Sequence, residues 1–193
     1  MAEAVRDVTV EHPKRTYTFV VDYGQNMELP VFNDKQPGPT YYYSPVGVYN
    51  LRVVNHVHVY KDGTIEKHMY AHVYNKAVSK KSANSVVSLI VKMLQQLNLL
   101  RDDSAGGELN IIFDNCSGQN KNNTVLKLPV WLKAKGYFKN VNFIFRIDDH
   151  TKNAADSLFN SIKHEYRKKS LFTMEALFNC VCVFGLQLRM SYC

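Results

Sequence analysis

The sequence predicts an α/β protein built on a mixed sheet of five strands, with helices on both faces. In the first half of the chain, three apolar strand-like segments follow one another without a helix between them, which favours antiparallel pairing. In the second half, strand-like segments alternate with helical ones, which favours parallel pairing. The 193 residues, of which 46% are hydrophobic and 21% charged, suit one globular domain with a proper core.

The first predicted strand is Thr16–Val21, a run of β-branched and aromatic residues that ends at Asp22. Gly24 follows, so the chain can turn there. Residues 1–15 are polar, and we expect them to form a disordered extension before a core that spans residues 16–175.

The second and third strands are predicted at Val46–Tyr60 and Thr64–Tyr74, joined by a tight turn at Asp62-Gly63. A long loop, Val31–Tyr43, precedes them. Its three final tyrosines, Tyr41–Tyr43, leave two interpretations open: they stack on nucleic-acid bases, or they cover a sheet edge.

The clearest helix is Ser82–Leu100, which Ser82 can cap. One apolar stripe at helical spacing predicts that the helix packs on the sheet; it consists of Val86, Leu89, Ile90, Met93, Leu94 and Leu97. The fourth strand, Leu109–Phe113, ends at Asp114 and is followed by a polar loop, Asn115–Asn123.

The last predicted elements are a helix at Thr124–Lys135, a strand at Asn142–Ile147 and a helix at Asn153–Lys168. Pro129 lies inside the first of these helices and predicts a kink or a late start. Residues 176–193 form an atypical tail, which is either a packed terminal element or the product of a displaced reading frame or retained intron.

The formal net charge of +7 and the pI of about 9.2 favour an anionic partner, of which nucleic acid is the usual one, although a basic domain without such a partner fits as well. The first residues lack the apolar core of a signal peptide, and the most apolar stretch, Ala176–Leu188, is too short to span a bilayer. We therefore expect an intracellular protein without a membrane partner. Free thiols are expected at the four cysteines, Cys116, Cys180, Cys182 and Cys193.

Two of the buried strands end in an aspartate, Asp22 and Asp114. If these strands are parallel neighbours, about 4.8 Å apart, the two carboxylates could share a cation. Magnesium suits carboxylate oxygens, and two-metal sites hold ions about 3.5–4 Å apart. The alternative is that both acids mark turns and cap backbone N–H groups.

A third carboxylate would complete such a site. Asp156 lies in the first turn of the last predicted helix, whereas Asp148 and Asp149 are closer to the preceding strand. At helical spacing Asp156 shares a face with Lys163 and Arg167. Asp156 therefore either holds metal beside phosphate-binding cations or complements the helix dipole.

Three segments together resemble a known family: VDYGQNMELP at residues 21–30, DNCSGQNKNN at residues 114–123 and HTKNAAD at residues 150–156. They resemble the transposase-derived ribonuclease-H-like (DDE/DDD-type) domains that recur in oomycete, plant and insect genomes. The resemblance covers roughly residues 16–175 and implies a ribonuclease-H-like fold in which the first and fourth strands are neighbours. Asp149 stands where the family usually shows a small residue.

The resemblance also implies an activity: cutting or joining DNA phosphodiester bonds with two Mg²⁺ or Mn²⁺ ions, in the nucleus. Asp22, Asp114 and Asp156 match the family's acidic positions and would hold the ions, while His150 matches its histidine and would orient the attacking group or the phosphate. The alternative interpretation of His150 is a loop histidine bonded to backbone. Nucleic-acid contacts are expected from Gln119, Asn120, Lys121, Lys152, Lys163 and Arg167.

Alternatives remain for the polar loop Asn115–Asn123 and for the function of the whole chain. The amides of Gln119 and Asn120 could instead satisfy their own loop. The whole chain has three possible interpretations: an active transposase or nuclease core, a catalytically silent nucleic-acid-binding domain derived from one, or a truncated gene product without activity. A complete transposase would also carry a DNA-binding module before residue 16.

Overall fold

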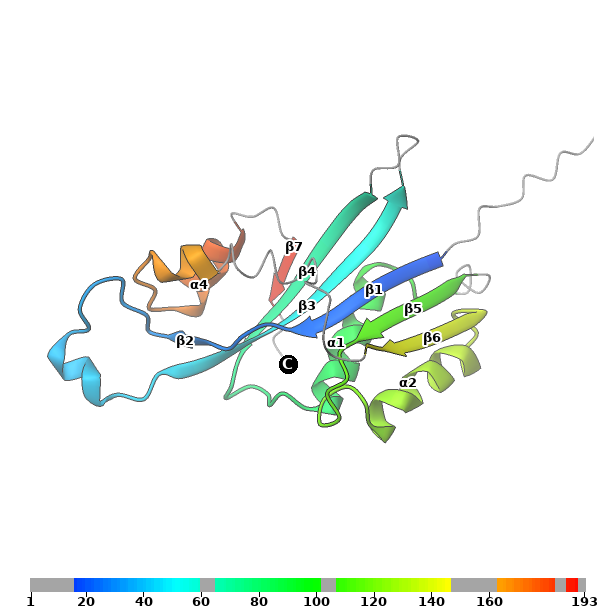
Figure 1. The fold of residues 1–193 in the computed structure, drawn as a ribbon, viewed down its shortest axis with the longest axis horizontal. Coiled ribbons are helices and arrows are strands. Elements are labelled where there is room, and N and C mark those ends of the chain that lie inside the picture. Colours follow the sequence, from blue (N-terminus) through cyan, green and yellow to red (C-terminus); the bar gives the residue numbers. More distant parts are fainter. Residues whose placement is uncertain (1–15, 60–64, 102–106, 147–162, 183–186, 191–193) are drawn as a thin grey trace, which may run out of the picture.

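Seven strands form one mixed sheet in the part of the chain that the computed structural model describes, which is residues 16–59, 65–101, 107–146, 163–182 and 187–190. The strand order is β6-β5-β1-β3-β4-β7, and β2 pairs with β3 beside this path (Figure 1). The strands are β1 (Thr16–Tyr23), β2 (Met27–Leu29), β3 (Val46–Val59), β4 (Ile65–Asn75), β5 (Glu108–Phe113), β6 (Asn140–Phe145) and β7 (Gln187–Met190).

The sheet has an antiparallel part and a parallel part, as predicted. β3 pairs antiparallel with both β1 and β4, whereas β5 pairs parallel with both β1 and β6. The α/β class, the mixed open sheet and the flanking helices are therefore confirmed, but the predicted strand number of five is wrong for these residues. β2 was missed because it has only three residues, and β7 because its pairing with β4 joins segments that are distant in sequence.

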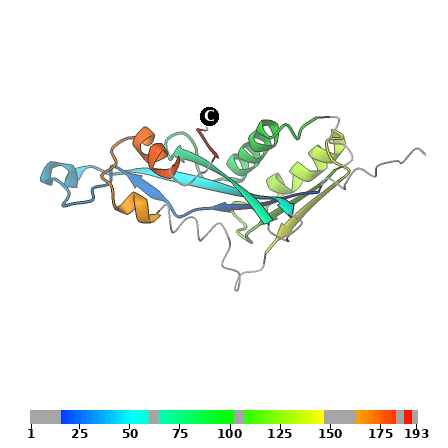
Figure 2. The ribbon, with the colours of Figure 1, turned by 90° about the horizontal axis from the view of Figure 1, so that it is seen from above.

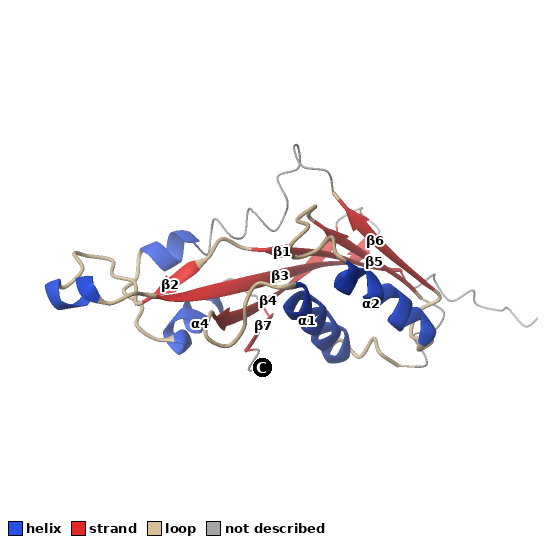
Figure 3. Cartoon of the chain, turned by 90° about the horizontal axis from the view of Figure 1, so that it is seen from below, coloured by secondary structure: helices blue, strands red, loops and turns tan. Residues whose placement is uncertain are grey.

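Two helices, α1 (Ala83–Gln96) and α2 (Asn123–Ala134), lie on the same side of the sheet (Figures 2 and 3). Ser82 caps α1 as predicted, because its side-chain oxygen accepts a hydrogen bond from the N–H of Ser85. The predicted apolar stripe is buried from Val86 to Leu94, and Leu97 packs against it at the helix end. These residues form the main core with side chains from β1, β3, β4 and β5.

The helix α2 starts at Asn123, so the predicted late start at Pro129 is wrong. The side chain of Asn122 accepts hydrogen bonds from Thr124 and Val125 N–H, and this cap sets the start of the helix. Pro129 lies inside the helix, and Val125, Leu128 and Leu132 turn toward the main core.

The described part of the C-terminal tail packs against the rest of the fold. The helix α4 (Met174–Cys182) contributes Leu177, Phe178 and Cys180 to a second cluster of buried residues that also contains Met27, Leu29, Val48, Ala71, Val73 and Leu171. β7 then pairs parallel with β4. The boundary predicted at residue 175 therefore does not separate the tail from the sheet.

The hairpin of β3 and β4 matches the two predicted strands closely, with a register irregularity between His56 and His58. Its predicted turn, Asp62-Gly63, lies outside the described residues, as does most of the predicted helix 153–168, of which residues 163–167 are seen to be helical. In the described part of the chain, every helix is too short or too polar to cross a bilayer.

Candidate functional site

Asp22 and Asp114 lie at the same end of two neighbouring parallel strands. β1 and β5 pair in parallel, and the last pair of their register is Val21 with Phe113. Asp22 and Asp114 are the next residue in each strand direction. The prediction that the first and fourth expected strands are neighbours is therefore confirmed.

The Asp22 side chain lies on the face of the sheet opposite the helices α1 and α2. Val21 and Phe113 belong to the main core with these helices, and side chains alternate between the faces of a strand. On the opposite face, Val20 and Ile112 form a small cluster with Val54. Asp22 follows this cluster at the carboxyl end of β1.

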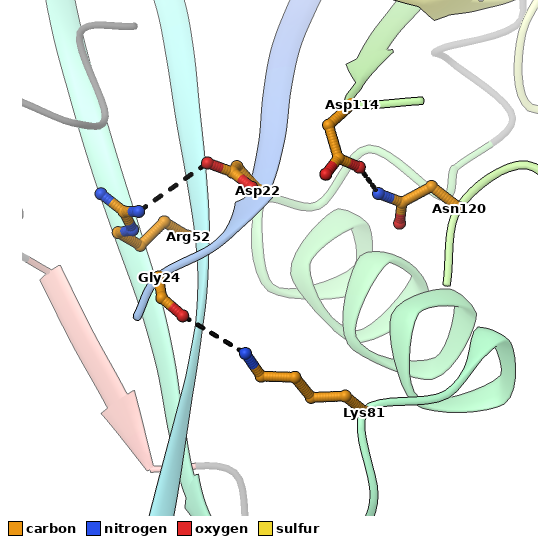
Figure 4. A network of polar contacts seen from close by, with 6 residues as sticks. All are labelled: Asp22, Gly24, Arg52, Lys81, Asp114 and Asn120. Atoms are coloured by element: carbon orange, nitrogen blue, oxygen red, sulfur yellow. Dashed lines mark hydrogen bonds and ion pairs between the residues drawn. The ribbon is translucent and has the colours of Figure 1, made fainter. Parts of the chain in front are cut away.

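Arg52 lies directly across from Asp22. The two residues are register partners in the β1–β3 pair, and Arg52 Nη2 lies 3.8 Å from Asp22 Oδ2 (Figure 4). The Arg52 side chain is only 4% exposed, against 25% for Asp22. A buried guanidinium needs a counter-charge, so this aspartate has a structural partner even without a metal ion.

Asp114 has a different partner, Asn120, in the loop between β5 and α2. The Asn120 side-chain amide donates a hydrogen bond to Asp114 Oδ1, and the N–H of Cys116 lies 3.5 Å from the same oxygen. Asn120 is only 2% exposed, which leaves little of it for the predicted contact with nucleic acid. In this structure Asn120 positions Asp114, which agrees with the alternative in which the amide satisfies its own loop, and its contact with nucleic acid stays a prediction.

Removing this amide should weaken the fold measurably. Asn120→Ala deletes a buried hydrogen bond to a carboxylate, so the free energy of unfolding should fall by about 1.5–3 kcal/mol. Urea denaturation followed by circular dichroism measures this loss. Asn123→Ala, at an exposed position in the same segment, is the matched control and should change stability by less than about 0.5 kcal/mol. Equal effects of the two substitutions would contradict the assigned role of Asn120.

Lys81 approaches the turn that follows Asp22. Its ammonium group donates to the carbonyl oxygen of Gly24 at 3.3 Å and lies 4.8 Å from the ring centroid of Tyr23 and 5.3 Å from that of Tyr49. Burial lowers the pKa of Lys81, and the nearby Asp22 carboxylate opposes that shift. Lys81 thus adds a second positive charge near Asp22.

The remaining predicted site residues divide into described and undescribed positions. Lys121 and Arg167 are exposed, Gln119 is partly buried, and Lys163 donates to Gln25 Oε1. His150, Lys152 and Asp156 lie outside the described residues. Within the described ranges, no group of three or more His, Cys, Asp or Glu side chains is arranged to hold a metal ion.

Arg52 and Lys81 were not among the residues predicted for this site. Arg52 left a signal, because a lone cation in the apolar run of the second predicted strand requires a buried acid beside it. No feature of the sequence marks Lys81 as a site residue, because lysines before a helix are common. Only the fold brings Lys81 to Gly24.

Residues 51–184, more than half of the chain, match a family described as Domain of unknown function (DUF7869). This chain belongs to the DUF7869 family. The part that matches DUF7869 contains Arg52, Lys81, Asp114 and Asn120, whereas Asp22 precedes it. No curated protein and no solved structure matches the chain. The description of DUF7869 states no activity, so the resemblance to transposase-derived domains remains a prediction.

Proposed function

We propose that this chain is the catalytic core of a transposase-like enzyme with a ribonuclease-H-like fold, which cuts or joins DNA phosphodiester bonds with two bound Mg²⁺ or Mn²⁺ ions. Asp22, Asp114 and Asp156 hold the ions in this proposal, and His150 orients the attacking group. The observation that carries the proposal is the pairing of β1 with β5, which brings Asp22 and Asp114 to one end of neighbouring strands.

The strand arrangement supports the ribonuclease-H-like assignment. Three strands that are consecutive among the five predicted ones, β1, β3 and β4, form the antiparallel part. The two later strands, β5 and β6, add in parallel to the other side of β1. This is the arrangement implied by the resemblance, in which the first and fourth strands are neighbours.

Arg146 and Lys163, the described residues that flank positions 147–162, support the role proposed for Asp156 as a metal ligand. Before this segment, the N–H of Arg146 donates to the carbonyl oxygen of Phe113 at 2.9 Å, next to Asp114. After it, Lys163 is bonded to Gln25, three positions beyond Asp22. Arg146 and Lys163 thus contact residues that are close in sequence to Asp114 and Asp22, respectively.

The donor atoms suit the proposed ions. Aspartate oxygens are hard ligands of the kind that Mg²⁺ and Mn²⁺ prefer. When bound, such ions supply a nucleophile at neutral pH and neutralise the charge on the leaving oxygen. The chain itself contributes the positioning: Asn120 holds Asp114 by its amide, and Lys81 binds the Gly24 carbonyl in the turn after Asp22.

Arg52 favours a second candidate, a catalytically inactive nucleic-acid-binding domain of the same origin. Asp22 turns toward Arg52 and Asp114 toward Asn120, so the two carboxylates face different partners (Figure 4). A cation at Asp22 would have to lie beside a buried guanidinium, and like charges at close range repel. In the active form Asp22 must exchange this ion pair for metal ligation.

The two candidates differ in what the purified chain does to DNA. Under the proposal, labelled DNA is cut or joined in the presence of Mg²⁺ or Mn²⁺ and stays intact in EDTA. If the second candidate is correct, the chain binds DNA in a salt-dependent manner, and the DNA stays intact both with the metal ions and in EDTA. Isothermal titration calorimetry with Mn²⁺ alone provides an independent readout, because only the first candidate requires saturable binding of the ion.

A further inference from the structure

The segment between β2 and β3 presents three tyrosines that cover nothing in the described structure. It contains the short 3-10 helix η1 (Gly38–Tyr42), which lies at the far end of the molecule from β6 (Figures 1 and 3). The exposed fractions are 77% for Tyr41, 87% for Tyr42 and 73% for Tyr43. The interpretation in which these tyrosines cover a sheet edge is therefore wrong, and the interpretation in which they stack on nucleic-acid bases remains.

The tyrosines are nevertheless held in a defined arrangement. The hydroxyl of Thr40 donates to the carbonyl oxygen of Pro37 at 2.6 Å, and the side-chain amide of Gln36 donates to that of Thr40 at 2.9 Å. The rings of Tyr41 and Tyr42 meet edge to face, with centroids 6.1 Å apart. No residue of η1 is buried, so this ordered helix does not contribute to the core.

The base of this segment is anchored to a strongly basic part of the chain. Val31 pairs with Leu171 through two backbone hydrogen bonds, the N–H of Asn33 donates to Ser170 Oγ, and Phe32 packs on Phe172. Immediately before this contact come three consecutive exposed cations, Arg167, Lys168 and Lys169. Glu165 lies close to the two lysines, at 3.3 and 3.9 Å from their ammonium groups.

A further cation flanks the other end of the segment. The N–H of Lys76, an exposed lysine after β4, donates to the carbonyl oxygen of Gly47 at the start of β3. Lys35, also exposed, lies within the segment itself. Exposed aromatic rings between basic flanks are the combination that binds single strands, because bases stack on the rings while cations contact the phosphates.

We propose that Tyr41, Tyr42 and Tyr43 form a stacking platform for single-stranded nucleic acid, with Arg167, Lys168 and Lys76 as its phosphate contacts. The inference rests on the proposed function only for the class of partner, nucleic acid, and is independent of any metal ion. A duplex keeps its bases stacked on one another, so the platform selects unpaired bases over paired ones.

Binding of a dye-labelled oligothymidylate of roughly 16 nucleotides, followed by fluorescence anisotropy in EDTA, tests this proposal. The combined substitution of Tyr41→Ala, Tyr42→Ala and Tyr43→Ala should raise Kd about tenfold or more, because each stacked base contributes substantially to affinity. The corresponding triple phenylalanine variant keeps the rings and should stay within about twofold of the unsubstituted chain. The matched duplex should bind more weakly than the single strand and should be insensitive to both variants.

Three outcomes would overturn the platform. Unchanged affinity of the alanine variant would show that the rings do not contact the ligand, and equal weakening by phenylalanine would assign the effect to the hydroxyls. A change in molar mass by light scattering in the alanine variant would make a second copy of this chain the occupant. Because the binding is measured in EDTA, its outcome does not depend on metal ions, and a failure of the proposed metal chemistry is distinguishable from a failure of the platform.

Discussion

Asp114→Asn is expected to lower metal-dependent cutting of DNA by at least about a hundredfold, since metal ligation supplies several kcal/mol to the transition state and about 1.4 kcal/mol corresponds to tenfold. The substitution keeps the size of the side chain and removes its charge. It also leaves an oxygen that can still accept the hydrogen bond from Asn120. The fold should therefore be retained, while the affinity for Mn²⁺ falls. The rate at which labelled DNA is cut measures the loss of activity.

Glu175→Gln is the matched control, because Glu175 is an exposed acid in the first turn of α4, outside both the aspartate site and the tyrosine segment. It should retain full activity. Activity of Asp114→Asn equal to that of the Glu175 control would exclude Asp114 as a ligand and with it the proposed two-ion site. If the unsubstituted chain binds DNA but leaves it intact with either ion, the inactive domain favoured by Arg52 is the better description.

Phe113→Ala should produce the largest loss of stability, about 3–5 kcal/mol, because it empties a fully packed position in the core. Phe113 is 1% exposed and is the last residue of β5, immediately before Asp114. Its ring lies edge-on to Phe143, with centroids 5.1 Å apart, and stacks on Phe145 at 5.6 Å. Such ring pairs contribute beyond the area they bury. Urea denaturation monitored by circular dichroism gives the change in free energy.

Ile144→Ala provides the comparison within the same layer of strands. Ile144 lies between Phe143 and Phe145 on β6, but it points to the other face and is 46% exposed. Its removal should cost no more than about 0.5 kcal/mol. A loss below about 1 kcal/mol for Phe113→Ala would mean that its ring is not packed between β5 and β6 as described.

Local patterns in the sequence were sufficient for most of the regular elements. The cap at Ser82 and the apolar stripe from Val86 to Leu94 predicted α1, because both signals act within a few turns of one helix. The switch from consecutive strands to alternating strands and helices predicted the mixed sheet. The aspartates at two strand ends predicted the juxtaposition of Asp22 and Asp114, once parallel pairing was assumed.

What the sequence by itself determined is thus the kind and order of most elements, but not β2, α4 or β7, and the two residues at the carboxyl ends of β1 and β5. Only the tertiary structure decided which groups those carboxylates meet: Arg52 comes from the strand paired with β1, and Asn120 folds back from its loop. It also decided that α4 and β7 join the fold and that Tyr41–Tyr43 stand free of it. The physical reason is that helix and strand signals arise between near neighbours in the chain, whereas ion pairs, burial and strand partners depend on long-range packing.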